Sequence, residues 1–417
     1  MKTITIKNNP IIIKNDNFQT IQIHAIYPYQ EEIKDLAKEI LIPQMLMYMT
    51  EQYPTEGEFQ KALKENYILS YFANQITIGT TACINFKLVI PDEQSLKQDV
   101  IEKQIQLFSN AIYHPKTVNQ YFDSFEVNRE KENLKLRMNS QEKSFKPYLN
   151  YTIAKLIDTD GIFSRDLKAH KELIEEITPK NLFEYYEQRI INNTPIIFIM
   201  GNIKEEKINP IIKKYFPIKE NLTLTTDYIH YLKPNKEKPQ EIVEEKEFKD
   251  SALSFIYKVK NMQKEDSIML GLIQSLLSSQ SSRLLSKKLR HENNLIYSSA
   301  VNYYPNYGLL KITAYINPKN KDITQEKILE VMDSLKDKDM ITPLIEKIKN
   351  RRRIDLIRSL DNKYDILNDK INKVLGIDDT EQERYEKLKE KTAEDVYNFM
   401  DKLQLDTIYF LKEKSHE

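Results

Sequence analysis

The sequence predicts an α+β fold made of two similar halves, and three observations support this prediction. Short segments rich in strand formers alternate with longer helical segments along all 417 residues. A strand, a helix, a shorter helix and two strands occur in this order in both halves. A hydroxyl-capped helix starts at Thr178 and another at Thr392, 214 residues later, and each leads into an apolar strand. We interpret this as a tandem duplication; the alternative is a chance similarity of two α+β domains.

The first half is expected to begin with strands and then to become mostly helical. Strands are expected at 11–13, 20–27, 75–78, 81–86 and 195–200. Helices are expected at 31–53, 58–65, much of 95–190, and 181–189. Pro28 should end the second strand, and Pro43 should kink or end the first helix, because proline lacks a backbone N–H. Gly79 is expected to separate the third and fourth strands.

Residues 217–245 differ from their surroundings and divide the chain. They are polar and rich in Lys, Glu and Pro, which favours an exposed linker. We therefore expect an N-terminal half at 1–216 and a C-terminal half at 246–417. In the latter, strands are expected at 251–259, 296–303, 309–316 and 407–411, with helices at 267–277, over the stretch from Ser282, and through most of 324–375.

The composition excludes several classes of protein. The chain has 62 Lys and Arg residues and 62 Asp and Glu residues, so its formal net charge is zero. A dedicated nucleic-acid or anionic-membrane binder would usually be basic, so the charge argues against both classes. The single cysteine, Cys83, cannot form a disulfide within the chain and fits a reducing cytoplasm. The N-terminus has no apolar signal core, and no run approaches 18 apolar residues. We therefore expect a cytoplasmic protein with no membrane or nucleic-acid partner.

A specific motif lies around Arg290 and Tyr297. This part of the chain resembles the second-half pattern of the insulinase/pitrilysin family of inverted-motif zinc peptidases. The matching stretches are Ser282-Arg283-Leu284, the run from Arg290 to Tyr297, and Gly308-Leu309. That family includes mitochondrial processing peptidases and the core subunits of respiratory complex III. The resemblance covers essentially the whole chain. It implies two mitochondrial-processing-peptidase-like α/β halves, each a mixed or antiparallel sheet packed with helices, that together form half of a clamshell.

The sequence departs from the family pattern at two places. Ser279, Gln280 and Asn294 stand where the family has Gly, although all three are compatible with turns. The larger departure is in the first half. Family enzymes carry His-x-x-Glu-His on a helix, where both His bind zinc, the Glu is the general base, and a distant Glu completes the site.

The positions of that zinc motif are occupied by residues that cannot bind zinc in the family manner. The best-fitting register places the motif on 40–44, so that Ile40, Pro43 and Gln44 replace its ligands and base, and Arg137 lies near the distant ligand. No two histidines have helical ligand spacing; the six are His24, His114, His170, His230, His291 and His416. The resemblance therefore implies no cofactor in this chain and zinc in a partner chain. Zinc held by ligands outside these patterns is the alternative.

Arg290 and Tyr297 are the family residues that this chain retains. In family members that divide their work between two chains, one chain supplies zinc and the other supplies this pair. The resemblance implies that Tyr297 stabilises the oxyanion formed when zinc-bound water attacks an amide, and that Arg290 holds the substrate backbone. From spacing alone, Arg290 fits equally an ordinary cation at a helix end, and Tyr297 fits an aromatic residue of a strand.

These features predict a non-catalytic subunit that pairs with a zinc-bearing insulinase-family chain to cleave unstructured peptides. The chain is similar to bacterial insulinase-family proteins associated by name with elongation factor P modification. The alternative is an inert scaffold or peptide-binding protein of the same fold, like the respiratory core subunits.

Three further segments carry weaker functional signals. The basic run 347–353 fits either a nucleic-acid patch or a solvated helix face, and its acidic neighbours favour the latter. The serines at 278–282 suggest a turn rather than a nucleophile, because no base or elbow motif accompanies them. Residues 75–78 offer an edge strand that an extended peptide can join.

Overall fold

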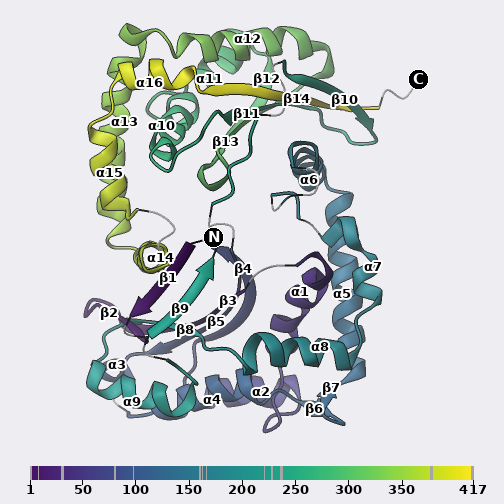
Figure 1. Cartoon of the computed structure of the whole chain (residues 1–417), viewed down its shortest axis with the longest axis vertical. Helices are drawn as coiled ribbons and strands as arrows, with labels where there is room; N and C mark the ends of the chain where they lie inside the picture. The colour runs from purple at the N-terminus through teal and green to yellow at the C-terminus, as the bar shows by residue number, and fades with distance from the viewer. Residues whose placement is uncertain are drawn as a thin grey trace. The chain divides into compact units, whose positions relative to one another are not determined.

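The computed structural model describes residues 2–7, 9–29, 32–78, 81–96, 98–158, 161, 163–165, 167–219, 221–226, 229–234, 238–375 and 379–414. The chain divides into two compact units (Figure 1). The first comprises Met1–Gln141, Arg165–Tyr228 and Val374–Ile377, and the second comprises Glu142–Ser164, Ile229–Lys373 and Asp378–Glu417. The segment 142–164 thus belongs to the second unit, although it precedes much of the first in sequence.

Each unit is built on a five-stranded sheet, and the two sheets have the same topology. The first has the order β2-β8-β3-β5-β4 and the second the order β10-β14-β11-β13-β12. In each, the strand at one edge runs parallel to its neighbour and all other pairs are antiparallel. The strands of the first sheet are β2 (Ile11–Lys14), β8 (Ile196–Gly201), β3 (Thr20–Tyr29), β5 (Thr81–Pro91) and β4 (Ser70–Ile78). Those of the second are β10 (Gln240–Lys246), β14 (Leu403–Glu413), β11 (Ala252–Val259), β13 (Leu309–Ile316) and β12 (Ile296–Tyr304).

This shared topology confirms the expected α+β fold with two similar halves. The two capped helices that suggested a duplication also match. Thr178 begins α8 (Pro179–Tyr186) and Thr392 begins α16 (Ala393–Met400), each through a reciprocal capping box with the residue three positions later. Each helix leads into the strand that pairs with the parallel edge strand of its sheet, β8 or β14.

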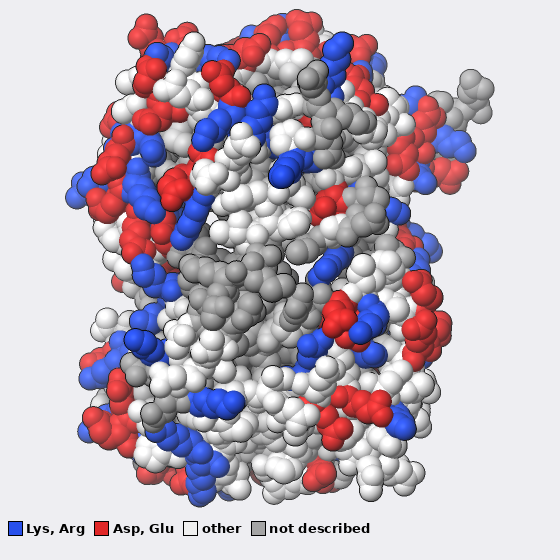
Figure 2. Space-filling model, in the orientation of Figure 1, with Lys and Arg blue, Asp and Glu red and all other residues white. Residues whose placement is uncertain are grey.

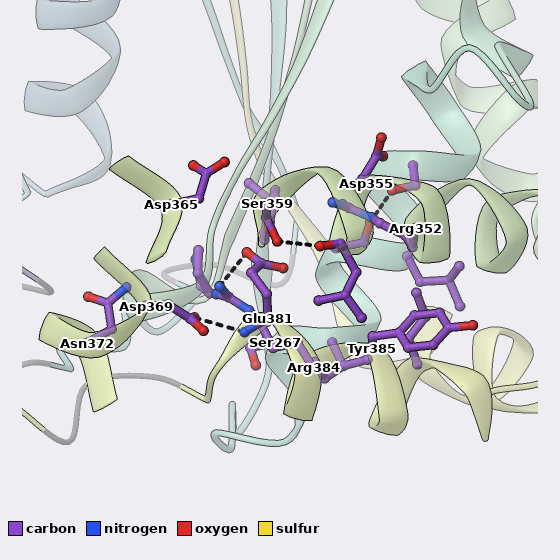
Figure 3. A pocket seen from close by; sticks show the side chains of 18 of the residues that line it. Ser267, Arg352, Asp355, Ser359, Asp365, Asp369, Asn372, Glu381, Arg384 and Tyr385 are labelled. Carbon is purple, nitrogen blue, oxygen red and sulfur yellow. Dashed lines mark hydrogen bonds and ion pairs between the residues drawn. The ribbon is translucent and has the colours of Figure 1, made fainter. Parts of the chain in front are cut away.

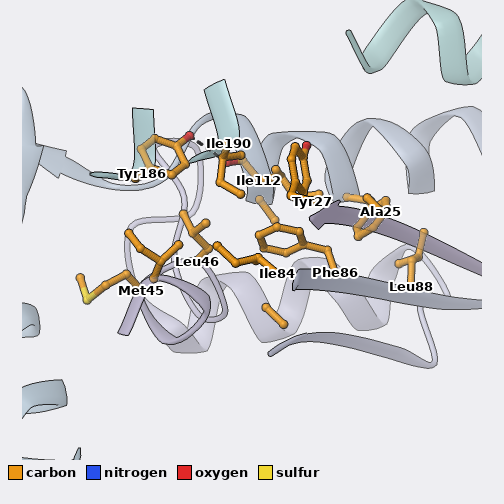
Figure 4. Packing of buried hydrophobic residues seen from close by; sticks show 14 of the residues in the cluster. Ala25, Tyr27, Met45, Leu46, Ile84, Phe86, Leu88, Ile112, Tyr186 and Ile190 are labelled. Atoms are coloured by element: carbon orange, nitrogen blue, oxygen red, sulfur yellow. Dashed lines mark hydrogen bonds between the residues drawn. The ribbon is translucent and has the colours of Figure 1, made fainter. Parts of the chain in front are cut away.

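The core of the first unit lies between its sheet and the helices that cover it. Apolar residues alternate along β3 and β5, so that one face of each strand packs against α1, α2, α4 and α8. Figure 4 shows this packing around Tyr27 and Phe86, whose rings meet edge to face at 5.9 Å between centroids. The covering helices are α1 (Leu36–Met45), α2 (Glu56–Glu65), α4 (Ile101–Tyr113), α5 (Ser124–Glu142), α8 and α9 (Glu205–Tyr215).

The first helix is shorter than the sequence analysis predicted. A 3₁₀ turn at Ile33–Asp35 precedes α1, which ends at Met45, whereas a helix was expected over 31–53. Pro43 lies inside α1, two residues before its end, so the helix stops soon after the proline as its missing N–H favours. Glu31, the expected start, and Gly79 lie outside the described residues. Ile78 and Thr81 nevertheless pair across β4 and β5, as a hairpin requires.

The sheet of the second unit is covered on both faces. One face packs against the helices that follow β11 and β13: α10 (Asp266–Ser278), α12 (Lys321–Ser334), α13 (Lys338–Ser359), α15 (Glu381–Lys389) and α16. The other face, which carries Ala252, Ile256 and Tyr409, packs against Leu149, Ile153 and Ile157 of α6 (Phe145–Ile157). Helix α6 therefore completes the second unit.

Two buried lysines join α6 to this sheet. Lys258 on β11 donates to the carbonyl of Ile157 at 3.2 Å and lies 3.3 Å from the carboxylate of Asp406. Lys311 on β13 donates to Oδ1 of Asn150 at 2.7 Å, and burial lowers its pKa to about 8. Because buried charges are costly unless paired or hydrogen-bonded, these contacts hold α6 in one position on the sheet.

The range 217–245, expected as a linker, contains two strands. Strand β9 (Asn221–Thr226) pairs with β1 (Lys2–Lys7), and β10 joins the second sheet beside β14. Residues 220, 227–228 and 235–237 of this range lie outside the described part of the chain. The remaining helices and strands are α3 (Glu93–Leu96), β6 (Thr117–Val118), β7 (Tyr121–Phe122), α7 (Glu172–Glu175), α11 (Leu284–Ser286) and α14 (Lys363–Val374).

Candidate functional site

The stretch that carries Arg290 is less regular than the continuous helix that the sequence predicted. Arg283 adopts a left-handed conformation, with φ of 51°, and precedes the single turn α11. A π-helical turn, Lys287–Glu292, follows directly. Asn294 then takes φ of 50°, which fits its expected role as a stop signal. Widened π turns are frequent at functional sites, where they displace side chains from the regular helical pattern.

Arg290 lies in this π turn and is exposed to solvent. Two residues earlier, the ammonium of Lys288 is engaged by Glu330, with 3.2 Å between N and O. Among the described residues, by contrast, no ion pair or hydrogen bond engages the Arg290 guanidinium. The planar guanidinium is therefore available for a carbonyl or carboxylate from outside the chain.

Tyr297 lies on β12, at an irregularity of the strand. Ile296 pairs with Ile316 while Ser298 pairs with Tyr315, so the register shifts at Tyr297. An extra residue of this kind redirects its side chain relative to the regular alternation of the strand. The side chain of Tyr297 is 66% exposed, and β12 is one of the two edge strands of its sheet. Its hydroxyl is thus directed away from the unit's own core.

The positions of the lost zinc motif lie on α1 and α5. Ile40, Pro43 and Gln44 belong to α1, with Pro43 buried and the other two partly buried. Arg137 lies on α5 and is exposed. In the described part of the chain, no group of three or more His, Cys, Asp or Glu side chains is placed to hold a metal ion. His416 lies outside that part.

A buried polar network surrounds α1, and sequence reasoning missed it. The Glu39 carboxylate is fully buried and accepts hydrogen bonds from Nε2 of Gln75, at 3.1 Å, and from the hydroxyl of Tyr185, at 3.3 Å. Burial, together with the charge of Glu39, raises the pKa of Tyr185, which therefore remains a hydrogen-bond donor. The only signal in the sequence is an acidic residue among the apolar residues of the predicted helix.

The guanidinium of Arg189 extends this network. It lies over the rings of Tyr29 and Tyr185, at 5.3 and 5.0 Å from their centroids, and 3.5 Å from the carboxylate of Asp35. Asp35 also pairs with Lys38 at 2.9 Å. The carboxylates at the start of α1 are thus balanced by cations of the chain itself, and the network fixes α1 against β4 and α8.

Among the weaker candidates, Lys349 and Arg351 of the basic run and Ser278 of the serine cluster take ordinary structural roles. In the basic run, Lys349 pairs with Glu346 and Arg351 with Asp355, at 2.8 and 3.1 Å, as a solvated helix face would. On the face of the molecule seen in Figure 2, Lys and Arg side chains are intermixed with Asp and Glu. The hydroxyl of Ser278 donates to the carbonyl of Gln274 at 2.9 Å, at the end of α10. None of the helices in the described ranges is long and apolar enough to cross a membrane.

Comparisons with known proteins agree with the fold and with the missing zinc motif. The model of the family "Peptidase M16 inactive domain" matches residues 176–352. A protein of Bacillus subtilis (strain 168) described as "Probable inactive metalloprotease YmfF" is 24% identical over 407 residues, which cover 96% of this chain and 95% of that protein.

Solved structures share the whole fold. A conserved protein from Enterococcus faecalis matches with a TM-score of 0.85 and 17% identity, covering 100% of this chain and 99% of that one. A protease from Helicobacter pylori matches with a TM-score of 0.76 and 16% identity, covering 99% of both chains. Topology, motif, family model and relatives agree that the chain is similar to the insulinase (M16) peptidases, and residues 176–352 match the inactive domain of that family.

Proposed function

We propose that this chain is the non-catalytic subunit of a two-chain zinc peptidase, in which it supplies Arg290 and Tyr297 to the active site of a zinc-bearing partner. The observation that supports this proposal most strongly is the exposure of both side chains. Tyr297 is 66% exposed at a bulge of an edge strand, and Arg290 is exposed in the π turn that precedes it. Their exposure leaves both side chains accessible to a partner chain.

The chemistry assigned to these residues follows from the reaction. Attack of water on a peptide bond places negative charge on the carbonyl oxygen, and a tyrosine hydroxyl stabilises that charge by donating a hydrogen bond. The guanidinium of Arg290 donates to a backbone carbonyl of the peptide and holds it in register. The partner chain supplies zinc and the general base, since the corresponding positions here are Ile40, Pro43 and Gln44.

The substrate class that fits this arrangement is an unstructured peptide. Strands β12 and β4 each form one edge of their sheets and therefore present backbone groups that an extended peptide can pair with. We place the reaction in the cytoplasm, where the single cysteine, Cys83, which is buried, stays reduced.

The proposal is tested by purifying the chain with its native zinc-bearing partner and measuring cleavage of a fluorogenic peptide. Tyr297→Phe removes only the hydroxyl, and we expect kcat to fall by roughly 100- to 1000-fold, as for the loss of other oxyanion donors. Arg290→Gln should lower kcat/KM, because substrate positioning is lost. Metal analysis should find zinc in the partner and none in this chain.

Matched controls separate catalysis from assembly. Tyr364 is 68% exposed, and Arg353 is an exposed arginine of α13, so Tyr364→Phe and Arg353→Gln should leave turnover unchanged. If the complex forms and Tyr297→Phe cleaves at the wild-type rate, the oxyanion role is refuted and the scaffold alternative is favoured. Stoichiometric zinc in the isolated chain would refute the division of labour between two chains.

A further inference from the structure

A cavity of about 420 Å³ lies among the helices of the second unit and is lined by neither Arg290 nor Tyr297. Figure 3 shows its walls, which α10, α13, α14 and α15 provide together with Tyr303 of β12 and Pro305. From α13 and α15, the lining side chains recur at i, i+3, i+4 and i+7, so each of these helices turns one face toward the cavity. The volume falls in the range of small-molecule sites in proteins, ~300–1,000 Å³.

The face that α14 turns toward the cavity is entirely polar. It consists of Asp365, Asn368, Asp369 and Asn372, which have the same i, i+3, i+4, i+7 spacing. The apolar residues of α14, such as Leu367, are buried on another side of the helix. Asp369 accepts from the backbone N–H of Glu381 at 2.9 Å. Within the described residues, the side chains of Asp365, Asn368 and Asn372 have no hydrogen-bonding partner.

An uncompensated cation lies on another wall. Arg352 of α13 lines the cavity, and in Figure 3 it lies on the opposite side from Asp365 and Asn372. Its nearest acidic neighbour on the helix, Asp355, pairs with Arg351 at 3.1 Å and with Arg358 at 3.8 Å. Over the described ranges, the Arg352 guanidinium takes part in no ion pair or hydrogen bond.

Between these poles the walls are largely apolar. Ile268 and Leu272 of α10, Leu356 of α13 and Leu388 of α15 line the cavity together with the rings of Tyr303 and Tyr385. The remaining lining charges are Glu381 and Arg384, which pair with each other at 2.6 Å. The cavity thus combines an acidic and amide-rich side, an apolar middle and a free guanidinium.

We propose that this cavity binds a short zwitterionic peptide, of the size of a di- or tripeptide. The amino terminus of the peptide would lie at the Asp365 carboxylate and the side-chain amides of Asn368 and Asn372. Its apolar side chains would lie between the tyrosine rings, and its carboxylate would lie at Arg352. A polyamine would satisfy the acidic side but would be repelled by Arg352, and a fatty acid would leave the polar face of α14 without a partner. The proposal does not rest on the proposed function, because the site lies in this chain alone.

The test uses the isolated full chain and the tripeptide trileucine, measured by isothermal titration calorimetry. We expect saturable binding that weakens by about tenfold when the peptide is N-acetylated, and by a similar factor when it is C-amidated, because each change removes one charge-assisted interaction. Arg352→Gln should weaken binding of the free acid about tenfold but leave binding of the amide unchanged. Asp365→Asn should weaken binding of the peptide with a free amino terminus about tenfold and leave binding of the N-acetylated peptide unchanged.

Control variants and a blocking variant make the test decisive. Arg353→Gln and Asp361→Asn change exposed residues that do not line the cavity, and both variants should bind trileucine normally. Gly271 also lines the cavity, so Gly271→Leu should fill it and abolish binding while circular dichroism shows an unchanged fold. No heat of binding at millimolar trileucine, or equal binding of free and blocked peptides, would overturn the proposal. Binding that survives Gly271→Leu would place the peptide elsewhere and overturn it too.

Discussion

The pH dependence of folding should be governed in part by His24, in the first sheet. Its Nδ1 lies 3.0 Å from Oδ1 of Asn85, whose amide nitrogen donates to Asn74 at 3.1 Å, so Oδ1 accepts and His24 carries its proton on Nδ1. Nε2 is buried, with no hydrogen-bonding partner among the described residues. Burial lowers the pKa of His24 to about 4; the bond to Asn85 opposes this shift and the charge of Lys87 adds to it.

The sign and size of the effect follow from linkage. Between pH 6.5 and pH 4, His24 is neutral in the folded chain but protonated in the unfolded chain. The contribution of His24 to the free energy of unfolding is therefore full above pH 6.5 and is lost as the pH falls toward 4. With an unfolded pKa of about 6.5, the free energy of unfolding should be lower at pH 5 than at pH 7 by about 2 kcal/mol from this group alone.

The assay is urea denaturation followed by far-ultraviolet circular dichroism at pH 5 and pH 7, for the wild type and His24→Gln. Other groups titrate in both proteins, so the difference between the two pH dependences isolates His24. From pH 7 to pH 5, the free energy of unfolding of His24→Gln should fall by about 2 kcal/mol less than that of the wild type. His114→Gln, at an exposed histidine, should behave like the wild type. Equal pH dependence of wild type and His24→Gln would refute the reasoning.

Further predictions concern glycine and a buried ion pair. Gly271→Ala should raise stability by about 0.5–1 kcal/mol in thermal unfolding, because Gly271 lies within a helix and the nearest neighbour of a Cβ there is the Tyr303 side chain, at an ordinary contact distance of 3.7 Å. Gly201→Ala should lower it by roughly 1–3 kcal/mol or more, because φ is +149° and the new Cβ would lie 2.8 Å from the carbonyl of Thr20. Lys258→Ala should cost about 3–5 kcal/mol in urea denaturation by leaving Asp406 buried without its cation. Adding Asp406→Leu should recover much of that loss, and failure to recover it would contradict the charge argument.

The fold was predictable because its signals are local and occur twice. Thr178 and Thr392 each cap a helix before an apolar strand, and the strand order of the two sheets confirms the repetition that these residues suggested. Asn294 ended its helix as expected, since asparagine adopts the left-handed conformation readily. Arg283 adopts the same conformation without any such preference, and for that reason the later start of the helix expected from Ser282, at Leu284, was not foreseen.

The polar interior was not predictable, because each buried group depends on partners distant in sequence. Glu39 is satisfied by Gln75 and Tyr185, which lie 36 and 146 residues away. His24 depends on Asn85 in the neighbouring strand. The cavity in the second unit requires four helices to turn faces toward one another, and the sequence of α14 alone shows only a polar stripe of the kind that usually meets water.

The position of α6 has a consequence for synthesis of the chain on the ribosome. This helix is complete at Ile157, whereas the strands that it covers begin at Ala252 and end at Glu413. At typical translation rates the nascent helix waits between roughly ten and fifty seconds for its sheet. Through that interval Leu149 and Ile153 lack the strands that bury them in the folded chain, so the nascent helix exposes an apolar face that favours chaperone binding or aggregation.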